Sequence, residues 1–199
     1  MLVTDDEQAW EKAWAYKDHG KSFDAVYNRP QTPSYNFRWL HESFGTNFRM
    51  TELQAVLGRI QLRKLPEWTK SRRQNAAVLS AGFAEVSGIR VTPPPEHIGH
   101  AYYKYYAYSV PERLRDDGDR ARVLKSINEA GVPCFSGSCS EIYLEKAFEG
   151  TVSRPVGRLP VARELGETSM MFLVHPTLDE ANMRKTVEVV SAVMKLAVR

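Results

Sequence analysis

The sequence predicts an α/β protein, more narrowly a small α+β domain, in which a small mixed or antiparallel sheet has flanking helices and a long connecting helix. Three observations predict this class. Apolar residues at positions 53–60 recur at i, i+3, i+4 and i+7, which is the spacing of one helix face. Residues 101–110 and 169–174 are rich in strand-forming side chains. Residues 179–198 return to helical spacing, so helices and strands share one core.

Composition narrows the classes of protein that this chain represents. Its 199 residues suffice for a substantial core, and 43% hydrophobic with 26% charged residues is ordinary for a globular protein. The net charge of +3 is spread along the chain, so we expect no nucleic-acid partner. No run approaches the roughly 20 apolar residues of a membrane span, so we expect no membrane partner. The acidic start, 1–6, does not resemble a signal peptide, and we expect a cytoplasmic protein.

The first 44 residues predict a strand, a helix and a long loop. Leu2–Thr4 is a short apolar run typical of a strand, and Asp5 or Asp6 suits the cap of a helix that runs to about His19. Gly20 is the expected stop. Residues 21–44 predict a loop that forms a pocket wall, a dimer contact or a local core, because it carries six aromatic side chains: Phe23, Tyr27, Tyr35, Phe37, Trp39 and Phe44.

The long connecting helix is predicted to begin at Thr51. Thr51 and Gln54 have the spacing of a capping box, in which each side chain accepts a backbone N–H of the other residue. Pro66 either kinks one continuous helix or starts a second one that reaches about Val86.

Residues 89–198 are predicted to form four strands and four helices. Pro93–Pro95 forces an extended linker, and Gly131 ends a helix that starts at Asp117, Gly118 or Asp119. Val187, Val190, Val193 and Met194 are expected on the inner face of the last helix. The expected strands are 89–92, 101–110, 132–135 and 169–174, and the expected helices are 117–130, 142–148, 159–165 and 179–198.

The stretch Gly45–Met50 contains the strongest candidates for ligand-binding residues in the sequence. It brings Asn47 and Arg49 to the start of a capped helix, where an amide and a guanidinium suit an anion. Two structural alternatives stand beside this hypothesis. Asn47 is favoured in such a turn in any case, and Arg49 also suits an ion pair that fixes the loop to the helix.

This stretch, read as Gly-x-Asn-x-Arg-Met-x-x-x-Gln-Ala, resembles the signature of the DegT/DnrJ/EryC1/StrS family of pyridoxal-phosphate-dependent sugar aminotransferases of fold type I. Further stretches resemble the same family: 1–6, 17–20, 160–165 and 173–178. The resemblance covers only about the C-terminal half of the family's usual length. It implies that residues 1–50 end the large cofactor-binding domain with an aromatic loop, and that 51–199 form the small C-terminal domain with the long helix.

The resemblance also implies a cofactor, a substrate and a partner. Asn47 would donate to the phosphate of pyridoxal 5'-phosphate in the active site of the neighbouring subunit of a homodimer or larger oligomer, with Arg49 beside it. The substrates would be a nucleotide-linked keto sugar and an amino acid such as glutamate. The Schiff-base lysine of the family lies just before the stretch matched by Leu2–Thr4. We therefore expect no catalytic residue in this chain and no activity of the chain alone.

Other candidate residues carry weaker signals. Glu141 and Tyr143 are expected as sugar contacts, because in the resemblance their loop lies near the substrate. Ser136–Ser140 lacks the Gly-x-Ser-x-Gly elbow of a nucleophile. Cys134 and Cys139 have no clustered partners and the five histidines lack metal-ligand spacing, so we expect no metal. A disulfide between the cysteines and a reduced pair both fit the sequence.

The sequence is also compatible with two other functions. Some members of the family run a cofactor-dependent dehydration with histidine in place of the lysine, and the sequence does not separate that chemistry from amino transfer. The chain also fits a non-catalytic domain that only dimerises with or binds a full-length relative. The sequence leaves the sugar, the nucleotide and the amino donor undetermined, and an unpaired apolar edge at Leu2–Thr4 predicts oligomers or aggregates.

Overall fold

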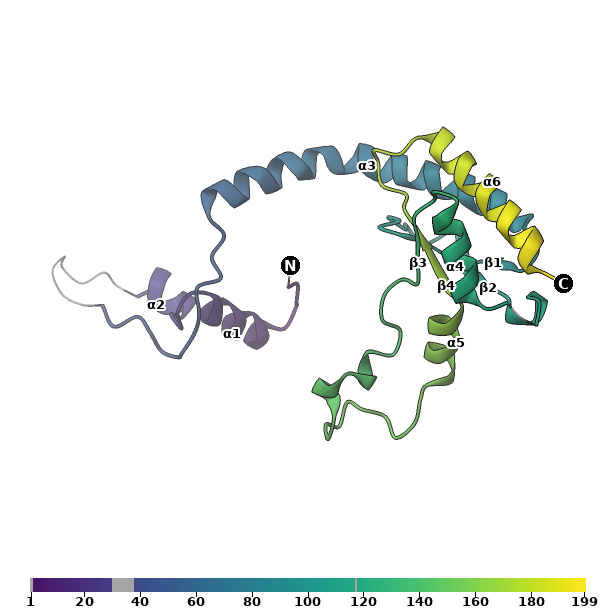
Figure 1. Cartoon of the computed structure of the whole chain (residues 1–199). Coiled ribbons are helices and arrows are strands. Elements are labelled where there is room, and N and C mark those ends of the chain that lie inside the picture. Colours follow the sequence, from purple (N-terminus) through teal and green to yellow (C-terminus); the bar gives the residue numbers. More distant parts are fainter. Residues whose placement is uncertain (1, 30–37, 117) are drawn as a thin grey trace. The chain divides into compact units, whose positions relative to one another are not determined.

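The computed structural model describes residues 2–29, 38–116 and 118–199. It contains two compact units, Met1–Arg63 and Lys64–Arg199. Helix α3 (Glu52–Ala84) begins in the first unit and ends in the second (Figure 1). The predictions for Tyr35 and Phe37, and for Asp117 as a helix start, fall outside the described residues.

The first unit begins with helix α1 (Glu7–Lys17), which confirms the predicted helix and its cap. The Asp6 side chain accepts the backbone N–H of Ala9 at 3.0 Å. The chain then turns through a left-handed backbone at His19 (φ 59°) and Gly20 (φ 86°), and the Gly20 N–H donates to the Ala15 carbonyl at 2.8 Å. Gly20 is thus the stop that the sequence indicated.

Two local predictions in this unit are wrong. Leu2–Thr4 forms no strand, and Leu2 and Val3 are exposed with no strand beside them in the described part of the chain. A short helix, α2 (Phe23–Tyr27), lies in the segment predicted to be loop. Its signal was Ser22, whose hydroxyl accepts the Ala25 N–H at 3.0 Å in the manner of an N-cap.

Helix α3 confirms the capping box. The Thr51 N–H donates to Gln54 Oε1 at 2.9 Å, and the Gln54 N–H donates to Thr51 Oγ1 at 3.3 Å. The helix continues through Pro66, so of the two alternatives the single helix of 33 residues is the one observed.

The second unit contains the predicted small sheet. Its strands are β1 (Ile89–Val91), β2 (Tyr105–Ser109), β3 (Cys134–Phe135) and β4 (Ser169–Phe172). The order across the sheet is β1-β2-β4-β3, and every neighbouring pair is antiparallel. Strand β4 is central and buried along its whole length, as its unbroken apolar pattern predicted.

Strand β2 begins four residues later than predicted. Tyr102 has a left-handed backbone (φ 47°), which ends extended structure there. Arg72 Nη1 donates to the carbonyls of Tyr102 and Tyr103 at 3.1 and 3.0 Å, and Arg73 Nε donates to the His100 carbonyl at 2.9 Å. These two arginines therefore fasten the segment before β2 to α3.

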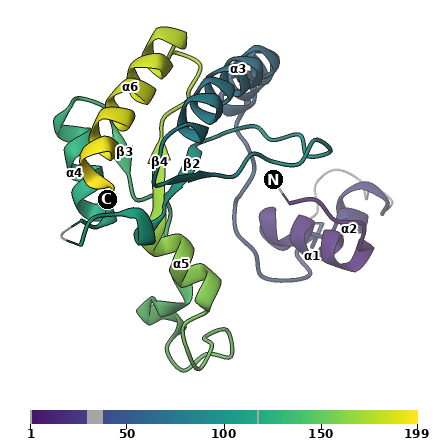
Figure 2. The same cartoon turned by 90° about the vertical axis from the view of Figure 1, so that its right-hand side faces the viewer.

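Three further helices belong to this unit: α4 (Arg120–Glu129), α5 (Pro160–Thr168) and α6 (Glu180–Ala197). Short 3-10 turns lie at Pro111–Arg113, Ile142–Leu144 and Lys146–Phe148. Figure 2 shows α6 beside the C-terminal part of α3, where a Cβ on Gly82 would lie 2.5 Å from the Val187 methyls. The core joins α3, α4, α6 and the sheet, with Phe83, Ile127, Met170, Phe172 and Val190 fully enclosed.

Candidate functional site

The Gly45–Arg49 loop is held against the end of α1 by backbone pairing. Asp18 and Asn47 form an antiparallel bridge. The His19 N–H donates to the Thr46 carbonyl at 3.0 Å, and the Phe48 N–H donates to the Lys17 carbonyl at 2.9 Å. The position of Asn47 is thus set by main-chain contacts on both sides of it.

This pairing requires glycine at two positions. A Cβ on Gly45 would lie 2.5 Å from the Gly20 nitrogen and 2.7 Å from the Tyr16 carbonyl oxygen. A Cβ on Gly20 would lie 1.7 Å from the Ser43 carbonyl oxygen. All three neighbours are backbone atoms, so the loop and the end of α1 approach each other only without side chains at these positions.

Arg49 is anchored by three side chains. Its Nε donates to Asn47 Oδ1 at 3.0 Å, its Nη1 lies 3.5 Å from Asp18 Oδ1, and its Nη2 lies 3.3 Å from His19 Nε2. Arg49 therefore takes part in an ion pair, but its partner differs from the one expected, because the pair fixes the loop to the end of α1 and not to the start of α3. The Arg49 side chain remains about half exposed.

The contact with Arg49 determines which way the Asn47 amide faces. A guanidinium has only donors, so the amide atom that it meets is the oxygen. The Asn47 Nδ2 group then faces away from Arg49, and no described residue accepts from it. Two N–H donors of an exposed amide, beside the half-exposed side chain of Arg49, form a donor set that fits a phosphate group.

Glu141 and Tyr143 lie together in a second cluster, in the Lys64–Arg199 unit. The Tyr143 hydroxyl donates to Glu141 Oε1 at 2.7 Å and accepts the Leu159 N–H at 2.8 Å. Arg158 Nε donates to Glu141 Oε1 at 2.9 Å, and Arg158 Nη2 donates to Glu141 Oε2. Tyr143 is buried and the Glu141 side chain is 11% exposed, so internal contacts use most of their polar atoms.

The charges of this cluster are strongly coupled. The hydrogen bond from Arg158 is the main cause that lowers the pKa of Glu141 to about 2, and the same bond raises the pKa of Arg158. Burial, followed by the hydrogen bond to Glu141, raises the pKa of Tyr143. The cluster therefore carries an ionised Glu141 and a neutral Tyr143 at neutral pH.

The remaining sequence predictions concern metals and cysteines. Within the described ranges, no group of three or more His, Cys, Asp or Glu side chains is arranged to hold a metal ion. Cys134 is buried and Cys139 exposed, and both thiols are free. No described helix combines the length and apolar character that crossing a membrane requires.

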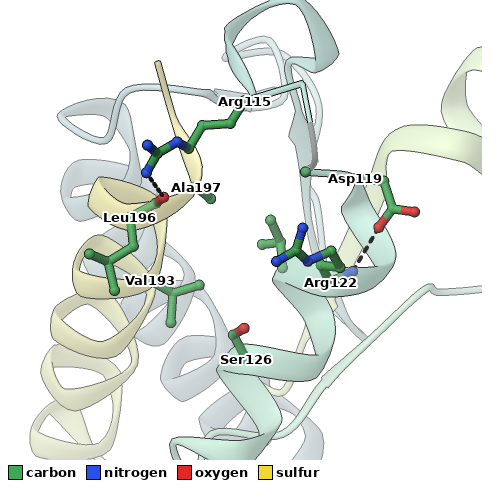
Figure 3. Close-up of a pocket in the computed structure, with 9 residues that line it drawn as sticks. Arg115, Asp119, Arg122, Ser126, Val193, Leu196 and Ala197 are labelled. Carbon is green, nitrogen blue, oxygen red and sulfur yellow. Dashed lines mark hydrogen bonds between the residues drawn. The ribbon is translucent and has the colours of Figure 1, made fainter.

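A pocket of about 260 Å³ lies between α4 and α6 (Figure 3). Arg122 and Ser126 of α4 line one side, Val193 and Leu196 of α6 line the other, and the Arg115 side chain reaches the end of α6. Arg115 Nη1 donates to the Leu196 carbonyl at 3.3 Å, so this side chain satisfies a carbonyl at the end of α6. That contact explains Arg115 as a helix cap, and we assign this pocket no role in the chemistry.

The first unit exposes an apolar stripe on α3. Along this stripe Leu53 is 71% exposed, Val56 and Leu57 are each 53% exposed, and Ile60 is 40% exposed. Among residues 2–29 and 38–63, Ala25 is the one apolar side chain that is buried. A unit with so little core of its own presents a surface suited to another protein segment.

Comparison with known proteins identifies the family. The model of the DegT/DnrJ/EryC1/StrS aminotransferase family matches residues 1–191. The chain belongs to this family. Members of the DegT/DnrJ/EryC1/StrS family include pyridoxal-phosphate-dependent sugar aminotransferases, and the predicted resemblance is confirmed.

Individual relatives place the chain within the family. It is 53% identical to an aminotransferase of Psychrobacter cryohalolentis, with a TM-score of 0.88 over 98% of this chain and 51% of that one, which confirms the predicted fold. It is 28% identical over 149 residues to the dTDP-4-dehydro-2,3,6-trideoxy-D-glucose 4-aminotransferase of Saccharopolyspora spinosa, covering 72% of this chain and 34% of that one. It is 26% identical over 138 residues to a GDP-4-keto-6-deoxy-D-mannose 3-dehydratase of Yersinia pseudotuberculosis, covering 67% of this chain and 34% of that one. The chain therefore spans about a third to a half of the length of these relatives.

Proposed function

We propose that this chain is the C-terminal portion of a pyridoxal-phosphate-dependent aminotransferase that transfers an amino group from an amino acid, such as glutamate, to a keto group of a nucleotide-linked sugar. The support is membership of the family together with the donor set at Asn47 and Arg49. When bound, the cofactor supplies the electron sink for the transfer. The contribution of this chain is to bind the cofactor phosphate.

The observation that carries the proposal is the fixed orientation of Asn47. The amide oxygen is engaged by Arg49 Nε at 3.0 Å, which leaves the two Nδ2 hydrogens as donors for an anion. In the proposed homodimer, these donors reach the active site of the neighbouring subunit. The exposed stripe of α3 then belongs to the surface that the rest of the protein or the second subunit covers.

Glu141 and Tyr143 are proposed to contribute to binding of the sugar. Their loop is proposed to form one wall of the sugar pocket, where the Glu141 carboxylate would accept sugar hydroxyls with its remaining lone pairs. Arg158 and Tyr143 hold that carboxylate in place. The free thiols of Cys134 and Cys139 favour a cytoplasmic location.

A chimera tests the proposal. The part of the Psychrobacter aminotransferase that precedes the matched region would be fused to this chain, and 2-oxoglutarate formed from glutamate and a nucleotide-linked keto sugar would be measured. We expect activity of the chimera and none of the chain alone. In the chimera, N47A should raise the pyridoxal phosphate concentration needed for half-saturation by about tenfold or more, because a charge-assisted hydrogen bond is lost. A chimera that binds cofactor but transfers no amino group would contradict the proposal.

A second measurement addresses the lysine. The purified chain would be incubated with pyridoxal phosphate, reduced with borohydride and weighed intact. We expect no specific adduct, because we propose that the Schiff-base lysine is not among these residues. One stoichiometric adduct on a single lysine would show that the chain holds the cofactor covalently.

The exposed apolar stripe also favours an alternative, a non-catalytic domain that binds a full-length relative. The chimera distinguishes the two, since a purely binding domain gives no product. The similarity to a dehydratase makes water loss from the sugar a further chemistry to assay with the same chimera.

A further inference from the structure

We propose that His19 and Asp18 are positioning residues, which hold Arg49 and thereby orient the Asn47 amide so that its two N–H groups face a cofactor phosphate. The identity of the ligand rests on the proposed function. The orientation itself rests on the contacts around Arg49 alone.

The first step concerns the protonation of His19. Arg49 Nη2 lies 3.3 Å from His19 Nε2, and a guanidinium nitrogen can only donate. The imidazole nitrogen must therefore accept, which places the ring proton on Nδ1. A neutral His19 with this tautomer is the form that stabilises the observed position of Arg49.

The second step concerns Asp18. Its Oδ1 lies 3.5 Å from Arg49 Nη1, and the Asp18 side chain is only 13% exposed. Lys21 Nζ also lies 3.7 Å from the same oxygen. Because Asp18 and His19 contact the two different terminal nitrogens of Arg49, rotation of the guanidinium would break both contacts.

The third step links Arg49 to Asn47. The immobilised Nε–H donates to Asn47 Oδ1 at 3.0 Å, and the Arg49 backbone N–H lies 3.4 Å from the same oxygen. An amide flip would point Nδ2 at these donors and turn the oxygen outward, where it would repel an anion. Asp18 and His19 thus oppose the flip without touching the ligand.

Nitrogen-15 NMR of the whole chain, with inorganic phosphate as the probe, tests this inference. The variant H19G removes the acceptor, and glycine suits the left-handed backbone at this position (φ 59°). H19Q supplies an amide oxygen in place of Nε2. The matched control is H41G, because His41 lies in the same unit and pairs with Lys21 through the backbone.

We expect the Arg49 Nε–H signal to be protected from exchange in the wild type, H19Q and H41G and to be lost in H19G. Phosphate should shift the Asn47 side-chain amide signals, with a dissociation constant about tenfold higher in H19G than in the wild type. H19G with an unchanged Arg49 signal and unchanged phosphate affinity would overturn the inference, and H19Q as weak as H19G would contradict the acceptor role. Loss of the Arg49 signal in H19G, with no phosphate shift in the wild type, would support the positioning and reject the proposed cofactor role.

Discussion

The Tyr143 hydroxyl lies 2.7 Å from Glu141 Oε1 and also accepts the Leu159 backbone N–H at 2.8 Å. One oxygen atom therefore connects a short 3-10 turn, Ile142–Leu144, to the residue that precedes α5. Residues 145–158 are thereby closed into a loop whose ends are tied by side chains. The stability of this loop depends on polar contacts more than on apolar burial, since Val152 and Val156 are fully exposed.

Removing the Tyr143 hydroxyl should destabilise the Lys64–Arg199 unit. Y143F deletes the donor to Glu141 and leaves the Leu159 N–H without its acceptor, which we expect to cost about 1–3 kcal/mol. Urea unfolding followed by circular dichroism measures the change. Y103F is the control, because the Tyr103 side chain is 78% exposed. Equal midpoints for the two variants would contradict the role of the hydroxyl.

The same cluster predicts a pH dependence. The pKa of Glu141 is about 2, below its ordinary value of 4.5, so its contribution to folding is complete above the ordinary value. As the pH falls from 4.5 towards 2, the unfolded state takes up a proton before the folded state does, and stability is lost. E141Q should be less stable at neutral pH and should show a flatter decline in acid. Urea midpoints across this range, compared between E141Q and wild type, measure the difference.

Two glycines in the first unit should respond in opposite directions. G45A places a Cβ 2.5 Å from the Gly20 nitrogen, so we expect it to destabilise the loop by about 2 kcal/mol or more and to abolish phosphate binding. G58A meets no atom within 4 Å and should stabilise α3 by about 0.5–1 kcal/mol. Denaturation followed by tryptophan fluorescence in a W68F background reports on this unit, because Trp68 is the tryptophan of the other unit. A tolerated G45A would show that the loop does not pack on α1 as described.

The two cysteines should differ sharply in reactivity. Burial raises the pKa of Cys134 to about 12, whereas Cys139 is exposed. Labelling the native chain with iodoacetamide at neutral pH should therefore modify one thiol, and C139S should abolish that labelling. Mass spectrometry of the labelled chain gives the count. Rapid double labelling of the native wild type would place Cys134 at the surface.

The apolar stripe on α3 should drive self-association of the chain. Replacing Leu57 and Ile60 together with glutamate introduces charge into the exposed stripe and should shift the chain towards monomer in sedimentation velocity. The double variant R59Q/R63Q, on exposed polar positions of the same helix, is the matched control, because it lowers the net charge by the same two units. A monomeric wild type would contradict self-association through this stripe.

The sequence predicted the elements with strong local signals. The capping box at Thr51, a cap at Asp5 or Asp6 and a buried strand at 169–174 were each predicted from residues close in the chain. The structure has the capping box, the cap at Asp6 and a strand over Ser169–Phe172. Strand limits were predicted less well, because the late start of β2 depends on Arg72, which is 30 residues away from Tyr102. The residue pattern around Tyr102 cannot indicate a hydrogen bond from a residue so distant in the sequence.

In the candidate site, too, local features were predicted from the sequence and contacts between distant residues were not. The loop around Asn47 was recognisable from its motif, but the anchoring of Arg49 was not. Asp18 and His19 lie about 30 residues before Arg49, and only folding brings the three side chains together. Arg158 was missed for a similar reason, since it meets Glu141 from the far end of a loop. A charged residue of each sign at the two ends of that loop was the available signal.

The place of β4 in the sheet has a consequence for biosynthesis. This strand lies between β2 and β3, yet the ribosome makes it after both of them. Until residue 172 has emerged, β3 has no strand to pair with, and Phe83 lacks its contact with Phe172. The nascent chain therefore carries an unfinished sheet from the completion of β2 at residue 109 until residue 172 has emerged. A ribosome that stalls before Ser169 would present chaperones and proteases with an open core.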